Sequence, residues 1–290
     1  MIELGYFLYS TAFVAAAMLM LYIAKSVFDF ATPFKLKVQM TEQDNPAVGI
    51  VLCGYLLGVI AVLAGSFIGE GEGSMDLDGF LNDMGPTAFY GLLGMSLLFL
   101  AGMINDKLIL RQFSNTGEVI NKKNVSVAVI IASSYLGSGL IIAGSLRGGE
   151  DILSVIVFFL IAQAALVLFA IVYQKATSYD DQKELGEHKN LACGLAFAGN
   201  LLAYSILLMK AGTMDGPDGE VIVLLERFQF FAYYAISGAI LLPLLRFIND
   251  IAFLPEAKLT VEIERDRNIN AGLLEASLAV GMAVVLIITL

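Results

Sequence analysis

The chain has 290 residues, of which 58% are hydrophobic and 15% are charged, and its mean hydropathy is +0.79. A soluble domain carries about 25% charged residues, so this much apolar chain cannot be buried in a water-soluble fold. The formal charge of −10 argues against nucleic acid as a partner. The composition therefore indicates an integral membrane protein whose first partner is the lipid bilayer.

Eight apolar runs are long enough to cross the hydrocarbon core, which takes about 20 residues of helix. They cover residues 5–28, 46–69, 85–104, 125–146, 152–173, 191–212, 228–248 and 269–290. We therefore expect an all-α, multi-pass protein with eight membrane-spanning helices.

Lysine and arginine collect on one side of these predicted helices. Fourteen of them lie in or beside the connections that follow the first, third, fifth and seventh spans. Only Arg147, Lys210 and Arg227 lie on the other side. Basic residues are retained in the cytoplasm. The distribution predicts that the N- and C-termini both lie outside.

An asparagine opens every second span, at Asn45, Asn124, Asn190 and Asn268. Their separations are 79, 66 and 78 residues, so alternate copies lie 145 and 144 residues apart. The chain is thus predicted to contain four two-helix repeats, grouped into a first half (1–145) and a second half (146–290). Because each half has an even number of spans, the two halves are expected to run in parallel through the membrane.

Small residues recur at fixed distances from each asparagine. Those two, nine and thirteen residues after it share one thin helix face, and those four and eight residues after it share another. The first set is Ala47, Gly54, Gly58; Ser126, Ser133, Gly137; Ala192, Gly199, Ala203; and Asn270, Ser277, Gly281. Small faces allow close helix packing in lipid, so each of these spans is expected to lie between two neighbours.

The four asparagines have two interpretations. Asparagine at a helix start caps free backbone N–H groups, and Pro46 after Asn45 suits a first helical position. Alternatively, residues 262–267 continue the last helix, which would leave the Asn268 amide free to bond a neighbouring helix or a bound species. Asp106 and Asp250, which are equivalent residues at the cytoplasmic ends of two spans, are expected to form a layer of ion pairs with nearby lysine or arginine.

Glu275 is the most conspicuous polar residue inside a span. It lies seven residues after Asn268, about 10 Å further along a helix, where the other three copies have apolar residues. A carboxylate at that depth costs about 2.5–3.5 kcal/mol and normally faces the protein interior. Glu275, Asn268 and Asn270 are therefore our candidate ion or proton site, the alternative being that Glu275 only hydrogen-bonds another helix.

Signatures of catalysis are missing from the sequence. We find no zinc-protease, nucleophile-elbow, Walker or dinucleotide-binding motif. Cys53 and Cys193 lie in apolar runs, where packing is their expected role. We therefore predict no catalytic residues, no metal, no cofactor and no enzyme activity.

Three segments carry a resemblance to a known family. They are Thr32-Pro33-Phe34, residues 41–49 (TEQDNPAVG) and residues 264–275 (ERDRNINAGLLE). They resemble the bacterial inner-membrane family defined as domain of unknown function 350, the YjfL-like proteins, here duplicated in tandem. The resemblance implies a location in the bacterial inner membrane and no assigned reaction. It also implies relatives that accompany membrane-stress proteins and polyamine-related enzymes.

Two hypotheses about function follow. The first is a channel or transporter-like protein for a small cation or proton, with Glu275 and the asparagines lining the route. The second is a non-catalytic membrane scaffold that docks a cytoplasmic stress-response or polyamine-related partner through residues 105–123 and 249–267. Either hypothesis is compatible with a homo-oligomer.

Overall fold

The computed structural model describes residues 4–66, 77–148, 151–213, 224–254 and 257–290. Within these ranges eight helices are long and apolar enough to cross a membrane. They are α1 (Leu4–Ala31), α2 (Pro46–Ser66), α3 (Leu77–Leu108), α4 (Val125–Gly148), α5 (Ile152–Ala176), α7 (Leu191–Thr213), α8 (Leu224–Ala252) and α10 (Ile269–Thr289). The predicted all-α, eight-span fold is confirmed, whereas the side on which the termini lie stays a prediction.

Helices α3 and α8 extend furthest beyond their apolar runs. Helix α3 begins at Leu77 although the apolar run begins at residue 85, and α8 extends to Ala252 although the run ends at residue 248. Our predicted bounds were wrong there because hydropathy detects only the stretch that needs lipid. A helix can continue into the polar region beyond it, since its backbone groups remain paired.

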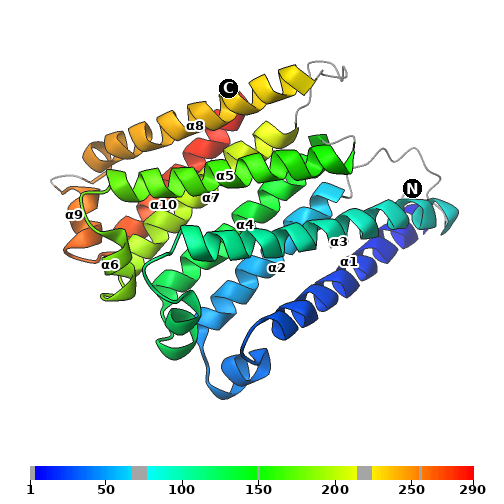
Figure 1. Cartoon of the computed structure of the whole chain (residues 1–290), viewed down its shortest axis with the longest axis horizontal. Coiled ribbons are helices and arrows are strands. Elements are labelled where there is room, and N and C mark those ends of the chain that lie inside the picture. The colour runs from blue at the N-terminus through cyan, green and yellow to red at the C-terminus, as the bar shows by residue number, and fades with distance from the viewer. Residues whose placement is uncertain (1–3, 67–76, 149–150, 214–223, 255–256) are drawn as a thin grey trace.

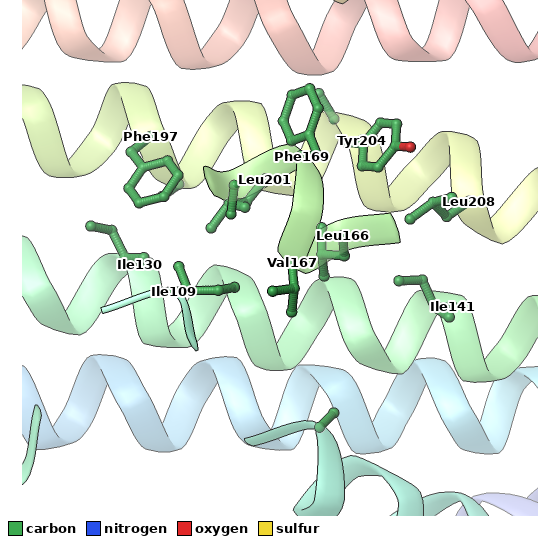
Figure 2. Packing of buried hydrophobic residues seen from close by; sticks show 14 of the residues in the cluster. Ile109, Ile130, Ile141, Leu166, Val167, Phe169, Phe197, Leu201, Tyr204 and Leu208 are labelled. Carbon is green, nitrogen blue, oxygen red and sulfur yellow. The ribbon is translucent and has the colours of Figure 1, made fainter. Parts of the chain in front are cut away.

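The spanning helices form two layers, and within each layer the helices lie side by side in chain order (Figure 1). Helices α2, α4, α7 and α10 pack side by side in a row, each against the next, as Figure 2 also shows. Helices α1, α3, α5 and α8 form the second layer and lie over that row. The row therefore has two ends, one at α2 and the other at α10.

Glycines allow the helices of the row to approach closely. A Cβ atom on Gly194 of α7 would lie 2.6 Å from the Ser126 carbonyl oxygen of α4, and one on Gly65 would lie 2.6 Å from the Ala143 Cα atom. These distances leave no room for a side chain. Close packing through small faces is thus confirmed, and van der Waals contact of this kind holds helices together in lipid. Helices α4 and α7 lie between two neighbours of the row as expected, whereas the expectation was wrong for α2 and α10, which lie at the ends of the row and have one such neighbour each.

Larger side chains from the second layer fill the surface of the row. Figure 2 shows Leu166, Val167 and Phe169 of α5 over the seam between α4 and α7. The Phe169 ring stacks on Tyr204 with 4.3 Å between ring centroids. The two halves are therefore joined by a continuous apolar core.

Four short turns lead into the asparagine-capped helices. They are the π-helical turns η1 (Val38–Glu42) and η2 (Gly117–Asn121) and the short helices α6 (Asp181–Gly186) and α9 (Leu259–Glu264). The residue before each asparagine has a positive φ, between 47° and 51°, which reverses the chain. We call this end of the bundle the asparagine end and, from the basic residues, predict that it is cytoplasmic.

Candidate functional site

All four asparagines cap their helices. Each side-chain Oδ1 accepts a hydrogen bond from a main-chain N–H in the first turn, at 3.0–3.2 Å. Each Nδ2 donates at 2.9–3.0 Å to the side chain six residues earlier, which is Gln39, Glu118, Glu184 or Glu262. Our sequence analysis missed these four partners, although the spacing of six recurs in every copy.

Asn268 does not lie within a continuous helix. Helix α9 ends at Glu264 and α10 begins at Ile269, so the alternative of an uninterrupted helix was wrong. The Asn268 amide donates to Glu262 and its oxygen accepts from Asn270 N–H. The Asn270 side chain is exposed.

In the described part of the chain, Asp106 and Asp250 do not form the expected ion pairs. Each accepts a hydrogen bond from a residue in the connection that follows its helix. Asp106 Oδ1 accepts from Asn115 Nδ2 at 2.5 Å, and Asp250 Oδ1 accepts from the Thr260 main-chain N–H at 2.7 Å. Asp29 at the end of α1 accepts from Leu36 N–H in the same way, at 2.8 Å. The short connections bring a side-chain amide to Asp106 and a main-chain N–H to Asp29 and Asp250, and within the described residues Asp106 and Asp250 have these donors in place of lysine or arginine.

Glu275 lies in a buried polar cluster between the second-half helices. Its Oε1 is 2.6 Å from Arg246 Nε of α8. It also accepts from Tyr173 OH of α5 at 3.2 Å and from Asn200 Nδ2 of α7 at 3.1 Å. The carboxylate is 3% exposed, so its charge is balanced within the protein.

The guanidinium of Arg246 is held by an aromatic ring as well as by the carboxylate. It lies 4.6 Å from the centroid of the Tyr173 ring, which in turn stacks on Phe197 at 5.0 Å. Cations are attracted to ring faces in this geometry. The partners of Glu275 are therefore Arg246, Tyr173 and Asn200, and the cluster does not include Asn268 or Asn270.

Sequence reasoning counted Arg246 only as a topology marker. The side chain is 15% exposed and lies inside α8 rather than in a loop. A basic residue flanked by Leu245 and Phe247 within an apolar run was the available signal for a buried partner of Glu275.

A second acidic group lies beside this cluster, at the asparagine end. Asp181 of α6 accepts hydrogen bonds from Thr177 Oγ1 and from Cys193 Sγ. Burial raises the pKa of Asp181 to about 6, despite the lowering effect of Thr177 and Arg246. Burial also raises the pKa of the nearby Tyr179 hydroxyl well above its ordinary value.

The two halves differ at this place. With the shift of 144 residues, Gly102 and Ile131 of the first half correspond to Arg246 and Glu275. With the shift of 145 residues, Phe28 corresponds to Tyr173. The first half therefore has the aromatic ring but neither member of the ion pair.

The corresponding place in the first half is a cavity. Its volume is about 350 Å³, and its walls include Phe28, Gly102 and Ile131, the counterparts of the second-half cluster. Two further aromatic residues, Phe99 and Tyr135, also line it. Since Thr32, Pro33 and Thr116 form part of the wall, the cavity lies at the asparagine end.

The polar side chains that line the cavity are one carboxylate together with amides and hydroxyls. Asp106 supplies a carboxylate, and no lysine or arginine occurs among the described residues that line the cavity. Asn115 is 5% exposed and donates through Nδ2 to Asp106. Its Oδ1 has no hydrogen-bond partner in the described part of the chain.

A chain of hydrogen bonds runs from the cavity wall into the bundle. Asn105 lines the cavity and donates to Ser134 and, at 3.3 Å, to Ser138. Gln163 of α5 donates to Asn105 at 2.5 Å and accepts from Ser138 at 3.1 Å. Ser138 is thirteen residues into α4, about 20 Å along the helix, so the chain reaches the middle of the spans.

No group of three or more His, Cys, Asp or Glu side chains arranged to hold a metal ion occurs in the described ranges. The oxygen atoms of the hydrogen-bonded chain from Asn105 through Ser138 to Gln163 belong to amides and hydroxyls. Such atoms bind hard cations and water rather than soft metals.

Fold and site together define a polytopic α-helical membrane protein built from two tandem four-helix domains. Residues 1–146 and 149–290 each match the family described as Domain of Unknown Function (DUF350), and the chain belongs to that family. It is also similar to a UPF0719 transmembrane protein of Aquifex aeolicus (strain VF5), with 24% identity over 157 residues. That alignment covers 51% of this chain and 55% of the relative, so it spans about half of each protein. No solved structure matches the chain.

Proposed function

We propose that the protein is a non-enzymatic channel or transporter for a small monovalent cation in the bacterial inner membrane. The cavity of the first half carries this proposal, because it joins a carboxylate at the asparagine end to a polar chain that reaches mid-membrane. Polar side chains at that depth are costly unless they serve packing or a pathway.

The charge of the cavity favours a single positive charge. Asp106 is its one carboxylate among the described lining residues, and no basic side chain there offsets it. The unpartnered Oδ1 of Asn115 supplies a further acceptor. Phe28, Phe99 and Tyr135 add aromatic ring surface, which attracts cations.

The second half supports the same ligand class. A cation, the Arg246 guanidinium, lies over the ring of Tyr173, and the counterpart of that ring, Phe28, lines the cavity. We propose that the Arg246 guanidinium, paired with Glu275, occupies in the second half the place that a mobile cation occupies in the cavity of the first half. Glu275 then has a structural role, and the first half provides the route.

The test is cation flux in liposomes under an imposed membrane potential, using wild type, Asp106→Asn and Asp250→Asn. Asp250 is the matched control because it is the repeat equivalent of Asp106 and does not line the cavity. We expect wild type to conduct and Asp106→Asn to lose about ten- to a hundredfold in apparent affinity, since a charged hydrogen-bond partner contributes about 1.5–3 kcal/mol. Asp250→Asn should resemble wild type.

Two outcomes would overturn the proposal. One is that folded wild type conducts no better than protein-free liposomes, which would favour the scaffold hypothesis. The other is that Asp106→Asn and Asp250→Asn behave alike.

A further inference from the structure

The row α2–α4–α7–α10 uses one hydrogen bond three times. In each case the capping asparagine donates through Nδ2 to a main-chain carbonyl in the next repeat. The pairs are Asn45 with Val119 at 3.0 Å, Asn124 with Leu185 at 2.8 Å, and Asn190 with Ile263 at 2.8 Å. Each acceptor lies five residues before the next asparagine, so the three contacts are equivalent.

The helix contacts repeat in the same register. The residue nine positions after one asparagine packs on the residue eight positions after the next. Gly54 lies against Ala132 and Gly199 against Ala276. At the middle contact, Ser133 Oγ donates to the Ala198 carbonyl at 2.6 Å. The interface thus accommodates either glycine or serine at the ninth position.

The basic residue before an asparagine forms a third repeated contact. Lys123 Nζ donates to the Gln43 carbonyl at 2.5 Å, and Lys189 Nζ donates to the Lys122 carbonyl at 2.9 Å. Each therefore reaches back to the preceding repeat. The forward and backward faces of a repeat are thus different surfaces that fit each other.

The α10 end of the row has a forward face against which no described residue packs. Ser277 and Gly281, nine and thirteen residues after Asn268, are exposed, and a Cβ on Gly281 would meet no atom within 4 Å. At the equivalent position of α2, a Cβ on Gly58 would lie 2.6 Å from the Tyr135 carbonyl oxygen of α4.

The α2 end has the matching backward face. Gly49, four residues after Asn45, has no atom within 4 Å of its Cβ position, whereas its equivalent Gly194 is in tight contact with Ser126. Cys53, eight residues after Asn45, is exposed. Each end therefore displays one half of an interface that the chain itself forms three times.

We propose that copies of this chain assemble head to tail, with α10 of one copy packed on α2 of the next. Three internal interfaces supply the template, and the two end faces carry residues of the same size in the same register. Lipid tails conform to any apolar surface and need no glycine. An exposed stripe that includes Asn270 and Ser277 is therefore better matched by a helix.

The assembly has a definite geometry. Because the two faces differ, the contact is heterologous and repeats from copy to copy, which produces either a closed ring or an open filament. Asp44 occupies the position of Lys123 and Lys189, so it would lie against the last connection of the preceding copy. In that connection Arg265 pairs with Asp266 at 2.8 Å and Arg267 Nε lies 3.6 Å from Glu184, so the two helix faces, and not a charge pair, carry the proposed contact.

The native Cys53 provides a direct test. By the repeat register it should lie opposite position 277 of the neighbouring copy. Mild oxidation of the Ser277→Cys variant in native membranes should therefore join the introduced thiol of one copy to Cys53 of the next through an intermolecular disulfide. We expect a ladder of covalent multimers in Ser277→Cys and only monomers in Ser277→Cys combined with Cys53→Ser. Ser96→Cys, at an exposed site on α3, is the control and should give no ladder.

A second measurement does not depend on oxidation. Gly281→Leu adds bulk where the single chain has open space, so the monomer should fold while the assembly dissociates. Light scattering or native mass spectrometry should give multiples of 31.1 kDa for wild type and the single-chain mass for Gly281→Leu. Gly85→Leu, also in open space, should stay assembled. The proposal is overturned by a wild-type monomer, by a ladder that persists without Cys53, or by Gly281→Leu that assembles like wild type.

Discussion

Removal of the Glu275 carboxylate should expose the energetics of the buried ion pair. Glu275→Leu leaves the Arg246 guanidinium, 15% exposed, without its carboxylate. Breaking a buried pair in this way costs about 3–5 kcal/mol. Tyr173 OH also loses its acceptor, which adds about 1 kcal/mol, whereas Asn200 keeps its bond to the Ala196 carbonyl at 2.9 Å. We therefore expect a loss of about 4–6 kcal/mol in the free energy of unfolding.

The double variant Arg246→Met, Glu275→Leu separates pairing from packing. Replacing a buried ion pair by apolar residues of similar volume is close to neutral, so this variant should lose only about 1–2 kcal/mol through the unpaired polar neighbours. Ile131→Leu, at the position equivalent to 275 in the first half, controls for shape and should cost less than about 1.5 kcal/mol.

Reversible unfolding in mixed micelles, followed by far-UV circular dichroism, measures all four proteins. The expected order of stability is wild type, Ile131→Leu, the double variant and then Glu275→Leu. The reasoning is refuted if Glu275→Leu is as stable as wild type, or if the double variant is as unstable as Glu275→Leu.

Three further predictions concern the second half. Asn190→Ala should lower the free energy of unfolding by about 1 kcal/mol more than Asn268→Ala in thermal unfolding. Of these two asparagines, Asn190 donates to a following repeat within the chain and Asn268 does not; equal losses would contradict this. Since the pKa of Asp181 rises from 3.8 to about 6 on folding, the folded state binds the extra proton. Stability should therefore fall by about 2–3 kcal/mol as the pH rises from 4 to 6 and then level off, and Asp181→Asn should remove this slope in a pH series of unfolding midpoints. Gly199→Val places atoms into Ala276 of α10 and should destabilise by about 3 kcal/mol; unchanged stability to denaturant would show that α7 and α10 do not pack closely.

Much of the fold could be predicted because membrane insertion imposes simple rules. Apolar length located all eight spans, and the spacing from Asn45, Asn124, Asn190 and Asn268 located the repeats and their close-packed faces. Helix ends were less predictable, as α3 shows, because the polar turns outside the apolar run are held by local hydrogen bonds.

The site was harder to predict for two physical reasons. Arg246 and Glu275 are 29 positions apart and lie on different helices, so their pairing depends on how α8 and α10 pack. The cavity exists because Gly102 has no side chain and residue 131 is an uncharged isoleucine, where the second half has Arg246 and Glu275. Only the comparison of two halves in space reveals such a difference.

Filling the cavity with the protein's own second-half residues tests the central claim most directly. Three substitutions copy Arg246, Glu275 and Ala279 into the first half: Gly102→Arg, Ile131→Glu and Tyr135→Ala. The Tyr135 change is needed because its ring would meet a side chain at residue 102. Cation flux should be lost in this variant while circular dichroism and unfolding remain close to wild type. Wild-type flux through the folded triple variant would show that the cavity is not the route.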